Sequence, residues 1–221
     1  MSRIFASLAV VATLLILIGM FLGIKIGDYN GPYQQILQNQ AKLASHAKGM
    51  EILSEQEVGQ LESTIEKDFQ LLEPMQSRST IHKLLAILAA IVTVLVNSIA
   101  ITYFIGTNRW CKEVIQTYSL DAKDLEKSNS IKRRSFPWSF IGIVAILSIA
   151  ALGAASDPAT FLPDTHRYVE PHFWTAMFGV VLLAYAFMNQ YKRINQHSQL
   201  VDKILNDVKT IRTERGLEVE G

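Results

Sequence analysis

The chain has 221 residues, of which 49% are hydrophobic, and its 21 basic and 20 acidic side chains leave a net charge of +1. The nearly neutral net charge argues against nucleic-acid binding. The high share of hydrophobic residues argues against a soluble domain of this size. Long apolar stretches account for the composition, at residues 4–24, 84–105, 138–155 and 173–188. Each approaches or exceeds the roughly 20 residues that a helix needs to cross a bilayer. We therefore predict an all-α integral membrane protein with four transmembrane helices.

The predicted segments alternate between apolar spans and polar connections. In chain order they are a first transmembrane helix at 1–26, an extracytoplasmic amphipathic helical hairpin at 27–80, a second transmembrane helix at 81–106, a basic cytoplasmic loop at 107–136, a third transmembrane helix at 137–155, an extracytoplasmic loop at 156–171, a fourth transmembrane helix at 172–190 and a cytoplasmic helical tail at 191–221.

The first span carries three glycines at intervals of four residues, Gly19, Gly23 and Gly27. A helix face without side chains lets a neighbouring helix approach closely, so we expect these glycines to form a packing face. The apolar run is longer than that of a secretory signal peptide, and no small-residue cleavage site follows it. We therefore interpret the segment as an uncleaved helix.

Two amphipathic helices are predicted for residues 27–80, because their apolar side chains recur at helical spacing. The second helix begins at a capping box formed by Ser54 and Glu57. Pro74 and the polar run 77–80 predict a break before the second span. Such a hairpin is too small for a core of its own, so its apolar faces must pack on each other, on the membrane or on a partner.

The second span places Ala90 and Asn97 on one face with other small residues, a pattern that indicates a helix interface. An amide such as Asn97 is unfavourable in lipid, so we expect it to form a hydrogen bond across that interface. The helix is predicted to continue through Tyr118. The third span is predicted to begin at Pro137, since proline is common in a first helical turn.

The distribution of Lys and Arg predicts the orientation. Residues 107–136 carry seven and the tail from Tyr191 carries six, whereas 27–80 has four against eight acids and 156–171 has one. Both termini are therefore predicted to be cytoplasmic, in a bacterial inner membrane or a plasma membrane. The cluster Lys132, Arg133 and Arg134 can also attract anionic lipid head groups.

The fourth span is predicted to continue as a helical tail, because apart from Gly179 no glycine or proline interrupts it before Gly216. Within this tail a heptad-like seam is formed by Ile194, Val201, Ile204, Val208 and Ile211. Such a seam favours association between copies of the chain. The alternative is that the tail folds back onto its own subunit.

No motif of a nucleotide-binding loop, metalloprotease or hydrolase occurs, so no catalytic residue is predicted. His82 and His172 begin the second and fourth spans and are the candidates for haem or metal binding between helices. Both lie at a membrane boundary, outside the apolar stretches 84–105 and 173–188, and no further ligand spacing supports them, so we predict no cofactor and no metal. The only cysteine, Cys111, excludes disulfides within the chain.

The function that fits these features is a non-enzymatic membrane subunit or scaffold that assembles through helix contacts. Its partners would be the lipid bilayer and either further copies of the chain or other membrane subunits, and no nucleic acid. A channel or transporter is the first alternative, with Thr93, Asn97 and Thr102 as its polar face, although the four apolar stretches hold no charged residue. A transmembrane signal transducer is the second alternative.

Overall fold

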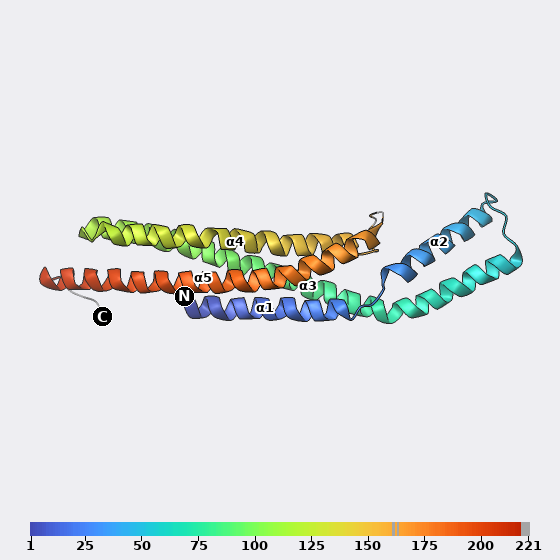
Figure 1. Cartoon of the computed structure of the whole chain (residues 1–221), viewed down its shortest axis with the longest axis horizontal. Helices are drawn as coiled ribbons and strands as arrows, with labels where there is room; N and C mark the ends of the chain where they lie inside the picture. The colour runs from blue at the N-terminus through green and yellow to red at the C-terminus, as the bar shows by residue number, and fades with distance from the viewer. Residues whose placement is uncertain (161, 163, 218–221) are drawn as a thin grey trace. The chain divides into compact units, whose positions relative to one another are not determined.

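The structure is a computed structural model that describes residues 1–160, 162 and 164–217. Within these residues the chain forms helices and no strand. The helices are α1 (Ser2–Ile24), α2 (Asn30–Ala47), α3 (Glu55–Tyr118), α4 (Ala122–Ser156), the 3-10 helix η1 (Thr165–Tyr168) and α5 (Val169–Glu214) (Figure 1). Phe161 and Pro163 of the predicted loop and residues 218–221 of the predicted tail lie outside the described part.

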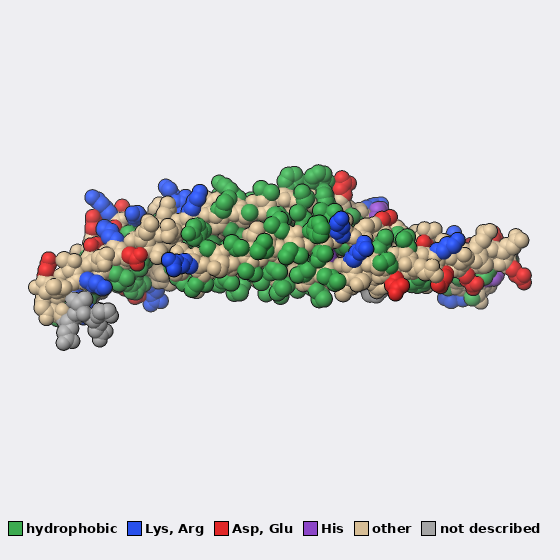
Figure 2. Space-filling model, turned by 90° about the horizontal axis from the view of Figure 1, so that it is seen from below, with side chains coloured by type: hydrophobic (Ala, Val, Ile, Leu, Met, Phe, Trp, Pro, Cys, Tyr) green, Lys and Arg blue, Asp and Glu red, His purple; other side chains and the backbone are tan. Residues whose placement is uncertain are grey.

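Four helices, α1, α3, α4 and α5, are long and apolar enough to cross a membrane. Their apolar stretches are mostly exposed: only 28% of the most apolar part of α1 is buried inside the protein. Figure 2 shows hydrophobic side chains gathered over these stretches. In water such a surface would drive aggregation, whereas in hydrocarbon it needs no cover. The predicted all-helical fold with four candidate membrane helices is therefore confirmed.

A short turn joins α1 to α2. Gly27 lies in this turn with a φ of +85°, a left-handed conformation that favours glycine. The carboxylate of Asp28 accepts a hydrogen bond of 3.0 Å from the N–H of Gly31, in the first turn of α2. Gly27, which we predicted on the glycine face of the first helix, is therefore outside that helix.

Helix α3 begins at the predicted capping box. The Ser54 hydroxyl oxygen accepts a hydrogen bond of 3.3 Å from the N–H of Glu57, and the Glu57 carboxylate accepts bonds of 2.8 Å from the N–H and the hydroxyl of Ser54. The bonds from the Ser54 backbone and hydroxyl hold the pKa of Glu57 below its usual value. The capping box is therefore confirmed.

The predicted break before the second span is wrong, because α3 runs without interruption from Glu55 to Tyr118, through Pro74 and residues 77–80. A proline inside a helix removes one hydrogen bond to the carbonyl four residues earlier, here that of Gln70. Pro74 and Gln70 are both exposed, so water can bind this carbonyl instead. A polar helix and the second span therefore form one helix.

The predicted cytoplasmic loop 107–136 is also helical. Helix α3 ends at Tyr118, Ser119 adopts a φ of +56°, and α4 begins at Ala122. Helix α4 then continues through Pro137, so the predicted start of a helix at this proline is wrong. Pro137 and Arg133, whose carbonyl loses its helical partner, are exposed, as at Pro74.

The prediction that the fourth span continues into a helical tail is confirmed by α5, which runs from Val169 to Glu214. The helix ends where Gly216 adopts a φ of +66°. The N–H of Leu217 donates a hydrogen bond of 3.0 Å to the carbonyl of Arg212, which closes the helix end.

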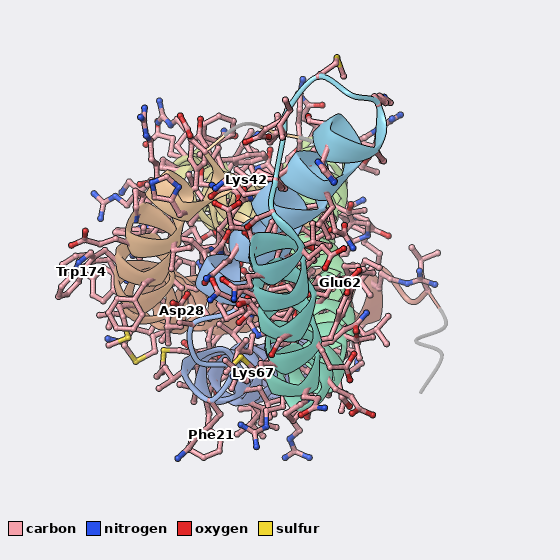
Figure 3. The ribbon with its side chains drawn as sticks, turned by 90° about the vertical axis from the view of Figure 1, so that its right-hand side faces the viewer. Phe21, Asp28, Lys42, Glu62, Lys67 and Trp174 are labelled. Atoms are coloured by element: carbon pink, nitrogen blue, oxygen red, sulfur yellow. The ribbon has the colours of Figure 1, made fainter. Side chains whose placement is uncertain are left out.

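The helices contribute to two compact units, which are residues 1–14, 90–147 and 179–221, and residues 15–89 and 148–178. The core of the first unit includes Phe5, Val96, Ala100, Phe104, Ile115, Ile131, Phe187, Ile194, Leu200 and Ile204. In the second unit the α1 and α5 side chains Phe21 and Trp174 point outward (Figure 3), and they are 59% and 50% exposed.

Candidate functional site

In the first unit, α3, α4 and α5 continue side by side beyond their apolar stretches. We call this part the polar bundle, formed by residues 107–118, 122–136 and 191–214. At its centre lies His197 of α5, which is fully buried. Its Nε2 is 2.8 Å from the hydroxyl of Ser128, which accepts a 2.8 Å bond from the amide of Asn108. Lys132 donates a 2.8 Å bond to the side-chain oxygen of Asn108, so the chain of bonds joins all three helices.

Hydroxyl groups lie at both ring nitrogens of His197. The Nε2 contacts the hydroxyl of Ser128, whose oxygen also accepts the bond from Asn108. The Nδ1 faces the hydroxyls of Thr107 and Tyr103 at 3.4 and 3.5 Å. Burial lowers the pKa of His197 from its usual 6.5 to about 4. The ring is therefore neutral near pH 7.

A serine bonded to a histidine is also the arrangement of a nucleophile and its base, but this site lacks the rest of such a machinery. Ser128 and His197 are both fully buried, so no substrate reaches the hydroxyl. The second ring nitrogen faces hydroxyls where a catalytic pair would have a carboxylate. Cys111 is buried as well, and burial raises its pKa, which disfavours the reactive thiolate. The network is therefore structural.

A second polar network lies deeper in the same unit, among the apolar stretches. The fully buried Asn97 of α3 accepts a 2.8 Å bond from the side-chain amide of Gln190 in α5 and donates one of 2.8 Å to the carbonyl of Thr93. Gly142 of α4 makes room for it, because a Cβ atom there would lie 2.7 Å from the Asn97 Oδ1. The amide thus holds three helices together through one bond and one close contact.

The polar face that we considered for a channel is not a common surface. Thr93 and Asn97 are fully buried inside the first unit, whereas Thr102 is exposed on another side of α3. Ala90, predicted on the packing face, is half-buried. Thr93 and Asn97 are therefore packed within one chain, and together with Thr102 they do not line one surface.

The predicted haem or metal candidates lie close together in the second unit. The rings of His82 and His172 are edge to face, with centroids 6.4 Å apart. Each ring sits over a glycine: a Cβ at Gly23 would lie 3.0 Å from His82, and one at Gly153 would lie 3.0 Å from His172. The Nδ1 of His82 is 2.8 Å from the carbonyl oxygen of Gly19. Among the described residues, no group of three possible metal ligands lies together.

The seam predicted for association between tails faces inward instead. Ile194 and Ile204 are buried in the core of the first unit, with 1% and 0% of their surface exposed. Val201, Val208 and Ile211 are half-buried. Polar side chains of the bundle, such as His197 and Ser128, meet across the same interface and bond within one chain. These positions fit the alternative that the tail folds back onto its own subunit.

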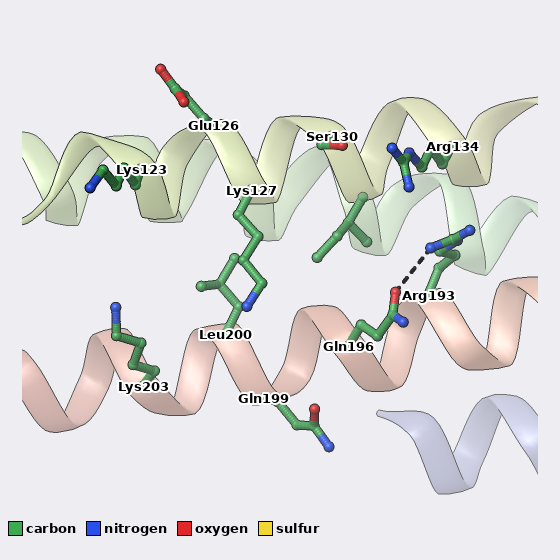
Figure 4. A pocket seen from close by; sticks show the side chains of 11 residues that line it. Lys123, Glu126, Lys127, Ser130, Arg134, Arg193, Gln196, Gln199, Leu200 and Lys203 are labelled. Carbon is green, nitrogen blue, oxygen red and sulfur yellow. Dashed lines mark hydrogen bonds between the residues drawn. The ribbon is translucent and has the colours of Figure 1, made fainter.

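The basic cluster predicted for lipid head groups is divided between different faces of α4. Lys132 points into the polar bundle and bonds to Asn108, while Arg133 is exposed. Arg134 is also exposed and lines a groove of about 630 Å³ between α4 and α5 (Figure 4). We call it the basic groove, because its charged lining consists of Lys123, Lys127, Arg134, Arg193, Lys203 and the single acid Glu126.

The sequence analysis missed several buried polar residues of α4. Ser128, Ser135 and Ser139 are at most 1% exposed and share one helix face with Gly142. Their spacing by seven, four and three residues is a sequence signal that could have identified this face. Gln190 was missed for a different reason: it lies at the predicted end of the fourth span, where a polar residue is common.

The geometry thus offers two structural networks, a pair of packed histidines and a basic groove. No family model matches the chain, and no curated protein or solved structure matches it either. The functional argument rests on the residues themselves.

Proposed function

We propose that the protein is a non-enzymatic membrane subunit or scaffold, which holds a rigid polar helical bundle at the membrane surface. The observation that carries the proposal is the network of the polar bundle, in which hydrogen bonds link His197, Ser128, Asn108 and Lys132 across three helices. Its most reactive side chains are buried, so what the bundle offers to other molecules is its surface. A buried network that joins three helices favours a fixed shape over a reaction cycle.

The proposed partners are the lipid bilayer and either further copies of the chain or other membrane subunits. In this proposal the polar bundle and both termini lie on the cytoplasmic side of a bacterial inner membrane or of a plasma membrane. The support is the excess of Lys and Arg in 107–136 and 191–221 over 27–80 and 156–171.

A signal transducer is the second candidate, and the continuity of α3 favours it. One helix of 64 residues carries both the polar segment that begins at the Ser54 capping box and the helix end at Tyr118. A change in the first segment could therefore reach the second without crossing a loop. Such a role also needs two stable states of this helix.

The proposed function is tested by purifying the full chain in mild detergent and measuring its mass by light scattering, with crosslinking in native membranes before extraction. We expect an assembly, either of identical chains or with another membrane subunit. A monomer in both measurements, with no crosslinked partner, would contradict the subunit or scaffold proposal.

A further inference from the structure

The basic groove holds more positive charge than the protein around it neutralises. Of its basic residues, Lys203 forms an ion pair with Asp124 at 2.7 Å, and Arg193 donates to the neutral Gln196. Within the described residues, no carboxylate lies in ion-pair distance of Lys127 or Arg134. Cations that converge without acids repel one another, and a bound anion relieves this repulsion.

The orientation of the side chains adds to this imbalance. Figure 4 shows Lys127 reaching from α4 toward Leu200 of α5, while the single acid Glu126 points away from α5. The floor of the groove is apolar, since Ile131 and Leu200 are almost completely buried. Ser130 contributes a neutral hydroxyl to the lining. The groove therefore combines charged walls, the hydroxyl of Ser130 as a hydrogen-bond donor, and an apolar floor.

We infer that the basic groove binds a phosphate-bearing ligand between α4 and α5. Arg134 and Arg193 lie on opposite walls, and a guanidinium group binds phosphate oxygens through two parallel hydrogen bonds. The volume of about 630 Å³ lies within the range of small-molecule sites and suits a phosphorylated head group or a short polyphosphate. This site does not depend on assembly of the protein, so it stands apart from the proposed function.

Two sources supply the same chemistry. Arg134 precedes Trp138 by one helical turn, and a tryptophan at the start of a span typically lies at the level of the lipid head groups. A lipid phosphate can therefore reach this end of the groove. Lys123 lies roughly 16 Å further along α4, at 1.5 Å per residue, where a soluble anion with several phosphates would reach it.

The test compares two double variants of the full-length protein that remove the same charge. Arg134→Gln with Arg193→Gln changes the groove, whereas Arg133→Gln with Lys192→Gln changes the exposed neighbours that do not line it. The protein is placed in phosphatidylcholine nanodiscs with a minor fraction of phosphatidylglycerol, and the retained phosphatidylglycerol is counted by mass spectrometry. Binding of inorganic tripolyphosphate is measured by calorimetry in nanodiscs of phosphatidylcholine alone.

We expect the groove variant to lose about thirty-fold in affinity, at about 1 kcal/mol per charge, and the control to lose less than about three-fold. Loss of phosphatidylglycerol alone identifies a lipid, and loss of tripolyphosphate binding identifies a soluble phosphate. Equal losses in both variants, or no binding of either probe by the parent, would overturn the site. If the groove variant melts below the parent, Lys123→Gln with Lys127→Gln replaces it, because both side chains are exposed.

Discussion

The amide of Asn97 shows how one residue depends on the size of another. Gly142 lies so close that a Cβ atom there would be 2.7 Å from the Asn97 Oδ1. We expect Gly142→Ala to displace the amide from Gln190 and to lower the free energy of unfolding by about 1–3 kcal/mol. Thermal unfolding in detergent measures this loss. Gly106→Ala is the control, because nothing lies within 4 Å of a Cβ there. The same melting temperature for Gly142→Ala and the parent would show that the Asn97 amide can move aside without loss of stability.

His197 makes the stability of the polar bundle depend on pH. Its pKa is lowered to about 4 by burial, whereas in the unfolded chain it returns to about 6.5. Between these values only the unfolded state binds the proton, so stability is full above pH 6.5 and decreases as the pH falls toward 4, by up to about 1.4 kcal/mol per pH unit. Chemical unfolding at pH 7 and pH 5 should show a smaller pH effect in His197→Gln than in the parent. The same pH effect in both would rule out His197 as its source.

At the residue scale, the sequence was informative where a residue type conflicts with its surroundings. Asn97 stands out because an amide in a lipid span needs a partner. Which residue provides that partner cannot be read from the chain, because Gln190 is 93 positions away in sequence. The same holds for His197, which is bonded to Ser128, a residue of another helix 69 positions away in sequence.

At the scale of elements, proline residues gave wrong predictions of helix ends where water can bind the carbonyl that the proline leaves without a partner. Pro74 and Pro137 predict helix ends, yet both lie inside long helices at exposed positions. The capping box at Ser54 was predictable because its bonds lie within one turn. Local chemistry therefore fixed where α3 begins, and packing against other helices decided how far it continues.

The contact between α1 and α3 predicts how substitutions of the α1 glycines change the melting temperature. His82 fills the space over Gly23 and bonds to the carbonyl of Gly19 at 2.8 Å. We expect Gly23→Leu to push this ring aside and to lower the melting temperature in detergent, with a loss of about 1–3 kcal/mol. In Gly19→Ala, a control on the same helix, nothing lies within 4 Å of the new Cβ, so its melting temperature should not fall below the parent value. Unchanged melting of Gly23→Leu would place this face against lipid.

At the scale of the whole molecule, the number of spans and their orientation rest on different evidence. Apolar length gives four candidate membrane helices, and the structure contains them. The predicted orientation rests on charge alone, namely seven bases in 107–136 against four bases and eight acids in 27–80. In the predicted topology the two ends of α3 lie on opposite sides of the membrane, so both can be tested.

The last prediction tests this orientation with single cysteines at the two ends of α3. Ser63→Cys and Gln116→Cys are suitable because both positions are exposed. A cysteine in place of Ser128 would be buried and would not react with the reagent. The parent serves as the background, because Cys111 is buried and its raised pKa keeps the thiol protonated. A membrane-impermeant maleimide added to intact cells should label Ser63→Cys and leave Gln116→Cys unlabelled until the membrane is permeabilised. Labelling of Gln116→Cys in intact cells would reverse the orientation and place the polar bundle outside.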